Sequence, residues 1–111
     1  MEPRLKSEIW VKALVRRLDV ELMTAMVTRS GDPEAGAVYL KINFLNGECR
    51  VLNRTYGEDG QRLWSSATGD APVDEARADE YLHRQVTYDP DCWIVEIEDP
   101  KGRFSPEDLL A

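Results

Sequence analysis

The sequence predicts a single α+β domain in which an antiparallel sheet of about five strands is covered by helices on one face. Helical and strand-like apolar spacings follow one another in the order helix, four strands, helix, strand. Asn46-Gly47 joins two of those strands through a tight turn, which pairs them antiparallel. The length of 111 residues suits one hydrophobic core, so residues 1–111 are expected to form one domain.

The first element is expected to be a helix from about Leu5 to Glu21, a segment without glycine or proline. Its apolar residues form one broad stripe at helical spacing, made of Trp10, Val11, Leu14, Val15, Leu18 and Leu22. A smaller apolar row lies beside the polar face and contains Leu5, Ile9 and Ala13. The helix is therefore apolar over more of its circumference than one sheet covers. Either other elements wrap around it, which suits a small domain, or part of it contacts a partner.

Four strands are expected to follow, over residues 24–29, 37–44, 48–54 and 61–67. Residues 37–44 alternate regularly, which is typical of a strand with one buried face. The loop from Gly31 to Gly36 is expected to connect the first two strands as a hairpin. The four strands are thus predicted to form an antiparallel meander.

A second helix and a last strand complete the predicted fold. The helix is expected to begin at Asp70-Ala71-Pro72 and to run to about Gln85, with a thin apolar stripe that indicates a surface position. The last strand is expected over residues 92–98, with Trp93, Val95 and Ile97 on one face and Ile94, Glu96 and Glu98 on the other. Residues 105–110 are predicted to be a short helix or a frayed tail.

The net charge of −7 comes from the C-terminal half alone. Residues 1–60 hold nine Lys and Arg against nine Asp and Glu, whereas residues 61–111 hold five against twelve. This surplus of acid argues against nucleic-acid binding, which needs basic side chains for the phosphates. The sequence contains no stretch of about 18 apolar residues that could cross a membrane. The first residues lack the pattern of a signal peptide, so a cytoplasmic location is expected.

The residues that most often carry chemistry are few. The two cysteines, Cys49 and Cys92, are expected to be free thiols, with a disulfide as the alternative. His83 is the only histidine, and its pairing with Asp79 four residues earlier is more often a solvated pair than a metal site. The sequence contains no recognisable catalytic motif. It predicts no cofactor, no metal ion and, on balance, no enzymatic activity.

Three blocks of sequence, at residues 4–11, 31–37 and 89–99, carry a family resemblance. The second block contains Gly31-Asp32-Pro33, and the third contains Asp89-Pro90-Asp91-Cys92-Trp93. The blocks resemble a family of small bacterial proteins that is catalogued as a domain of unknown function and is about as long as this chain. The resemblance implies a bacterial, cytosolic, stand-alone domain and no particular ligand or reaction.

The leading hypothesis is a non-enzymatic protein-interaction domain, either with a protein partner or as a homodimer through the first helix or a sheet edge. The candidate binding residues are all acidic and are Asp79, Glu80, Asp89, Asp91, Glu96 and Glu98. A competing interpretation of the last strand is a solvated face that pairs with Lys41 or with an arginine on a neighbouring strand. The alternative function is a small-molecule or metal-dependent site, lined by Arg16, Arg17 and Arg29 or by the carboxylates.

Overall fold

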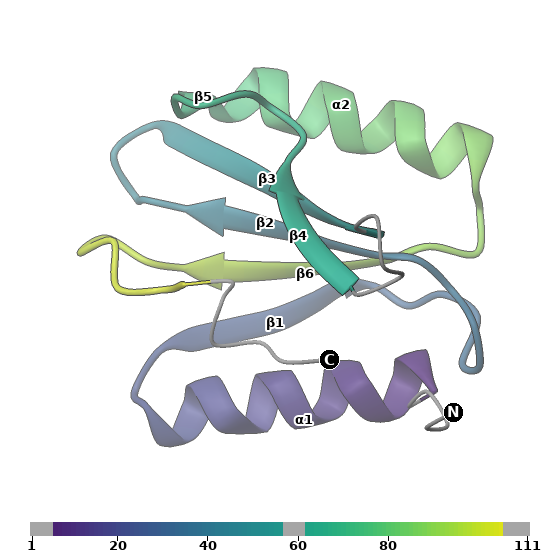
Figure 1. Ribbon diagram of the computed structural model, residues 1–111. Helices are drawn as coiled ribbons and strands as arrows, with labels where there is room; N and C mark the ends of the chain where they lie inside the picture. The colour runs from purple at the N-terminus through teal and green to yellow at the C-terminus, as the bar shows by residue number, and fades with distance from the viewer. Residues whose placement is uncertain (1–5, 57–61, 106–111) are drawn as a thin grey trace.

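The computed structural model describes residues 6–56 and 62–105 and confirms the α+β class (Figure 1). The helices are α1 (Ser7–Val20) and α2 (Glu75–Tyr88). The strands are β1 (Thr24–Arg29), β2 (Val38–Asn43), β3 (Glu48–Tyr56), β4 (Arg62–Ser66), β5 (Val73–Asp74) and β6 (Trp93–Glu98). Among the described residues, no helix is long and apolar enough to cross a membrane.

The sheet has the strand order β1-β6-β2-β3-β4, with the short β5 paired to β3. The predicted hairpin at Asn46-Gly47 is confirmed, because β2 and β3 are antiparallel neighbours. The rest of the predicted meander needs a correction, because β6 inserts between β1 and β2. The loop from Gly31 to Gly36 therefore crosses over β6 and is not a hairpin. β6 runs parallel to β2, and this is the one parallel pairing among the described strands.

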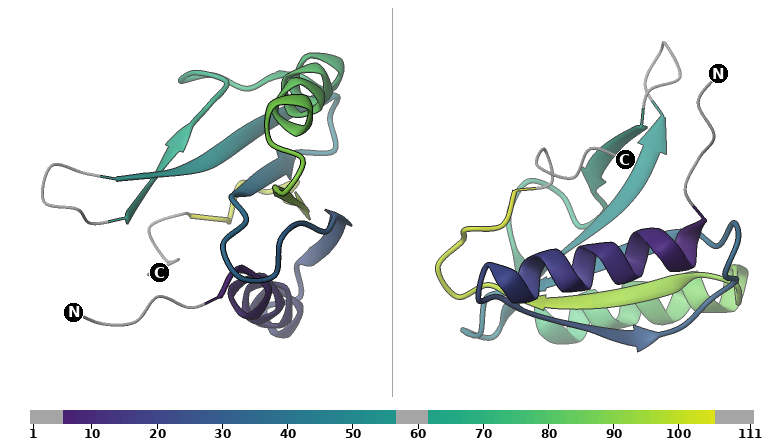
Figure 2. Two further views of the ribbon diagram at one scale, coloured as in Figure 1. Left: turned by 90° about the vertical axis from the view of Figure 1, so that its right-hand side faces the viewer. Right: turned by 90° about the horizontal axis from the view of Figure 1, so that it is seen from below.

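The two helices cover opposite faces of the sheet, so the prediction that they share one face is wrong (Figure 2). α1 packs on the face that contains Leu40, Val95 and Ile97. α2 packs on the face that contains Val51 and Ile94. The α2 face also holds the buried apolar side chains of Cys49, Val51 and Ile94, and burying both faces requires a layer on each side.

Helix α2 begins later than predicted because the residues before it join the sheet. Val73 pairs with Cys49, and Asp74 pairs with Glu48, so these residues are extended up to the helix start. The helix then continues to Tyr88, three residues beyond the predicted end. The predicted starts at residues 5 and 61, and the predicted helix or tail from residue 106 onward, lie outside the described residues.

Candidate functional site

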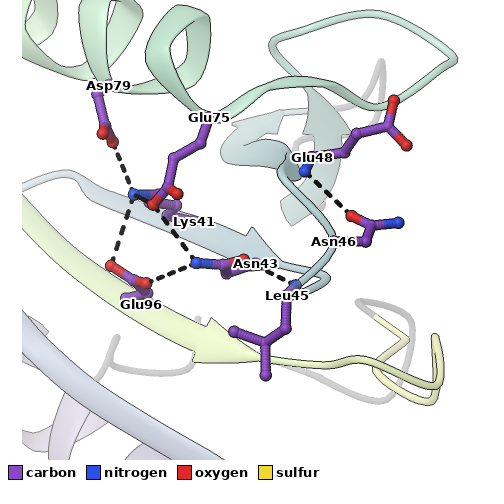
Figure 3. Close-up of polar contacts among 8 residues, drawn as sticks. All are labelled: Lys41, Asn43, Leu45, Asn46, Glu48, Glu75, Asp79 and Glu96. Atoms are coloured by element: carbon purple, nitrogen blue, oxygen red, sulfur yellow. Dashed lines mark hydrogen bonds and ion pairs between the residues drawn. The ribbon is translucent and has the colours of Figure 1, made fainter.

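Lys41 lies at the centre of a polar cluster between the sheet and helix α2 (Figure 3). On β2 it stands opposite Val51 of β3 and Glu96 of β6, so its side chain lies on the α2 face. Its ammonium is 2.8 Å from the Glu75 carboxylate, 2.7 Å from that of Asp79 and 3.6 Å from that of Glu96. The Lys41 side chain is only 7% exposed, so three acidic groups surround a buried cation.

Asn43 closes the cluster from the next position on the same face of β2. Its amide nitrogen donates hydrogen bonds to Glu96 at 3.1 Å and to Glu75 at 3.4 Å. Its amide oxygen accepts a hydrogen bond from the backbone N–H of Leu45 at 2.8 Å (Figure 3). The amide therefore links the carboxylates to the turn between β2 and β3, and each of its two ends has a partner.

The surroundings of Lys41 keep it charged. Burial by itself would lower the pKa of Lys41, because it disfavours the ammonium form. Hydrogen bonds to Asp79 and Glu75, together with the charge of Glu96, outweigh burial and raise this pKa above its ordinary value. Lys41 is therefore a protonated hydrogen-bond donor at neutral pH and does not act as an amine nucleophile.

An open groove of about 360 Å³ adjoins the Lys41 cluster, between α2 and strand β1. Its lining residues are Thr28, Arg29, Lys41, Asp79, Leu82, His83, Val86, Ile94 and Glu96. Arg29 is tied to the turn after α2, since it donates a hydrogen bond to the Pro90 carbonyl at 2.8 Å. Within residues 6–56 and 62–105, no group of three or more His, Cys, Asp or Glu side chains is arranged to hold a metal ion.

Three of the six predicted site residues, Asp79, Glu96 and Glu98, lie on α2 or on the face of the sheet that bears α2. Asp79 and Glu96 both contact Lys41, so the pairing with Lys41 in the competing interpretation is confirmed for Glu96. The same interpretation expected a solvated face, and this is wrong, because α2 packs on that face and the Glu96 side chain is only 19% exposed. Glu98 lies on the same face of β6, where it stands opposite Thr24 of the outer strand β1.

The other three predicted residues lie on α2 or in the turn that follows it. Glu80 is exposed on α2, with its carboxylate 4.0 Å from Arg84. Asp89 accepts a hydrogen bond from the backbone N–H of Asp91 at 3.2 Å, which shapes the turn. The carbonyl of Asp91 accepts a hydrogen bond from the backbone N–H of Asp32 at 2.8 Å.

The sequence reasoning missed Glu75 and Asn43 as members of the cluster. A signal for both was present, because Glu75 and Asp79 are four residues apart on one helix face, and Lys41 and Asn43 are two apart on one strand face. The three arginines that were predicted to line an alternative small-molecule site do not lie together. Arg16, Arg17 and Arg29 each line a different groove.

Both cysteines are free and buried, as predicted. Burial raises the pKa of Cys49 to about 11, and burial is also the main reason that the pKa of Cys92 is raised. A thiol needs to be ionised to act as a nucleophile, so neither cysteine is activated at neutral pH.

We expect the two thiols to be unreactive in the folded protein. At pH 7.5, a chromogenic thiol reagent such as Ellman's should release almost no colour from native protein, and should titrate two thiols in denaturant. Unfolding lets Cys49 ionise at its ordinary pKa, so stability should fall as the pH rises from that value toward 11. Rapid labelling of one thiol in native protein would contradict this prediction.

A second surface lies along strand β1, at the lower edge of the sheet in the right-hand view of Figure 2. Met26 is 41% exposed on the α2 face, and Val27 is 40% exposed on the α1 face. Leu22, in the turn before β1, is 91% exposed. A groove of about 550 Å³ runs between α1 and β1 and is lined by Lys12, Val15, Arg16, Asp19, Leu22, Met23, Thr24, Ala25 and Val27. The edge strand thus exposes one large apolar side chain on each face.

Comparison with known proteins places the chain in a family. The family model of a protein of unknown function, DUF1491, matches residues 5–105. The chain belongs to the DUF1491 family. No curated protein matches the chain.

Solved DUF1491 structures have the same fold. The chain is 39% identical to a DUF1491 family protein from Caulobacter crescentus CB15 in a crystal structure, with a TM-score of 0.81 over 90% of this chain and 92% of that one. An NMR structure of a DUF1491 family protein from the same organism gives 38% identity and a TM-score of 0.77, covering 92% of each chain. Protein Atu0922 from A. tumefaciens is 27% identical, with a TM-score of 0.76 over 97% of this chain and 93% of that one.

The three blocks of sequence that resemble DUF1491 meet at one place in the fold. The loop carbonyls of Glu34 and Pro33 accept hydrogen bonds from the first two backbone N–H groups of α1, at 3.2 and 2.9 Å. The hydroxyl of Ser7 donates to the Gly36 carbonyl at 2.7 Å, and the indole of Trp93 donates to the Asp32 carbonyl at 2.7 Å. In this DUF1491 protein the blocks therefore form a structural junction, where the loop satisfies the N-terminus of α1.

Proposed function

We propose that this protein is a non-enzymatic protein-interaction domain that binds its partner along the edge strand β1. The observation that carries the proposal is the exposure of Met26 and Val27 on opposite faces of the outermost strand. Edge strands in soluble proteins are commonly protected by charge, proline or cover. β1 carries no charge from Thr24 to Thr28 and no proline.

The backbone of β1 supports binding by strand addition. On its outer side β1 has no neighbour among the described strands, so the outward N–H and C=O groups of the strand are available to an added strand. An added strand gains main-chain hydrogen bonds, and its side chains alternate between the α1–β1 groove and the α2 face. Exposed apolar surface on both sides of β1 then supplies the hydrophobic contribution.

The acidic C-terminal half has a secondary part in this proposal. Asp79 and Glu96 neutralise Lys41, so their role is to hold α2 on the sheet. Glu98 lies on β6, the strand next to the edge, opposite Thr24 of β1. Its negative charge disfavours a partner that places an acidic side chain beside it. Glu80, Asp89 and Asp91 contribute to solubility. The proposal places the domain in the bacterial cytoplasm, in keeping with two free thiols.

The test is a pull-down from the source cell with the tagged full chain as bait. A Met26→Lys variant puts a charge at the centre of the edge strand, and Ala76→Lys adds the same charge on the exposed surface of α2 as a matched control. We expect the wild type and the control to recover the same partner or the second, untagged copy. Recovery should fall at least about tenfold with Met26→Lys. Equal recovery with all three baits would contradict the proposal.

A further inference from the structure

The exposed part of β1 has almost the same sequence in both directions. Thr24 and Thr28 stand at its ends, Ala25 and Val27 stand inside them, and Met26 is at the centre. A two-fold interface brings the same surface of two copies together, so it requires a surface that is complementary to itself. In an antiparallel pairing centred on Met26, Ala25 faces Val27 of the second copy and Thr24 faces Thr28 of the second copy.

The faces of the sheet agree with this register. Ala25 and Val27 stand opposite Ile97 and Val95, on the α1 face, and Met26 stands opposite Glu96 on the α2 face. Residues directly opposite one another in an antiparallel pair lie on the same face. Centring on Met26 pairs α1-face residues with α1-face residues, so both α1 helices lie on one side of a continuous sheet. A register shifted by one residue would mix the two faces.

The charges along β1 do not oppose a second copy at this place. The paired segment from Thr24 to Thr28 contains no charged residue, so no like charges are opposed across the interface. The first charged residue after it is Arg29, which would face Met23 of the second copy. The apolar pairs Met26–Met26 and Ala25–Val27 fall in the part of β1 that pairs regularly with β6, before the irregularity between Val27 and Arg29.

We infer that the partner at β1 is a second copy of this chain, joined by antiparallel pairing of the two β1 strands about a two-fold axis at Met26. The inference rests on the proposed function and names its partner. The two α1–β1 grooves then lie on the same face of the joined sheet, and the exposed side chains of Leu22 and Val27 border the new contact.

The oligomeric state tests the inference directly. Sedimentation equilibrium of the full chain, from low to high micromolar concentration, should give twice the chain mass. Each copy carries a net charge of −7, so added salt should screen the repulsion between copies and tighten the dimer. Met26→Lys opposes two ammonium groups at the axis and should weaken the dimer at least about tenfold, whereas Ala76→Lys should leave it unchanged.

Cross-linking tests the register. A Met26→Cys variant brings two thiols together at the axis, so mild oxidation should give a disulfide-linked dimer. Ala76→Cys is the matched control and should stay monomeric on denaturing gels, since the native Cys49 and Cys92 are buried. A dimer that survives Met26→Lys and gives no Met26→Cys cross-link would place the interface elsewhere and overturn the inference.

A monomeric wild type at high micromolar concentration would also overturn the inference. In that case the pull-down separates the two proposals. A different protein that is lost with Met26→Lys would keep β1 as the interaction surface, with another chain as its partner. A monomer with no Met26-dependent partner would overturn both.

Discussion

Replacing Gly31 with alanine is expected to lower the free energy of unfolding by about 3 kcal/mol or more, because no space exists for a side chain there. A Cβ atom at Gly31 would meet the backbone carbonyl oxygen of Asp91, and would lie 2.6 Å from the carbonyl carbon of Cys92. These atoms are backbone and cannot rotate away. The loop and the turn before β6 would have to separate, which would also break the hydrogen bond from Asp32 to Asp91.

Gly47→Ala is the matched control for Gly31→Ala. Gly47 has φ +90°, and a Cβ atom added there would meet nothing within 4 Å, so alanine causes backbone strain without a clash. We expect a loss of about 1 kcal/mol for the control. Urea unfolding followed by tryptophan fluorescence measures both variants. A loss for Gly31→Ala no larger than that of the control would show that the loop does not pack on the turn.

Replacing Lys41 with methionine is expected to lower the free energy of unfolding by about 3 kcal/mol. The change removes the cation and leaves Glu75, Asp79 and Glu96 facing one another between α2 and the sheet. Glu96 is the most buried of the three, with 19% of its side chain exposed, so it is the least able to be solvated instead. Urea unfolding followed by tryptophan fluorescence measures the loss.

Lys12→Met is the matched control for the Lys41 variant. Lys12 also contacts a carboxylate at 2.9 Å, that of Glu8, but its side chain is 74% exposed. We expect the control to cost about 0.5 kcal/mol or less. Combining Lys41→Met with Asp79→Asn should recover part of the loss, since one of the opposing charges is then gone. Equal losses for the two lysine variants would show that the Lys41 cluster does not hold α2 in place.

Much of the fold could be predicted from local pattern. The alternation over residues 37–44 and the Asn46-Gly47 turn specify a hairpin, because a tight turn and a two-residue period act on neighbouring residues. The insertion of β6 between β1 and β2 could not be predicted in the same way. Which distant strands pair depends on how the whole apolar surface is buried. No local pattern in β1 or β2 specifies that another strand lies between them.

The candidate site, like the fold, could be predicted only where local pattern determines it. The spacing of Glu96 and Glu98 led to the competing interpretation of a solvated face that pairs with Lys41 or with an arginine, and the pairing with Lys41 is found for Glu96. Glu75 and Asp79 reach Lys41 only because α2 covers that face of the sheet, whereas the sequence predicted both helices on a single face. The exposure of β1 likewise followed from its place at the edge, which depends on where β6 pairs.

The position of β6 has a consequence for how the protein is made. It is the last of the described strands along the chain, yet it lies between β1 and β2, which are synthesised well before it. Before the ribosome has translated β6, no strand connects β1 to the β2–β3 hairpin in the sheet. The sheet therefore closes only after residues 93–98 have left the exit tunnel, and its assembly depends on contacts between distant parts of the chain, which slow folding. Until then the backbone edges of β1 and β2 that face β6 in the finished sheet are both unpaired and open to pairing with other chains.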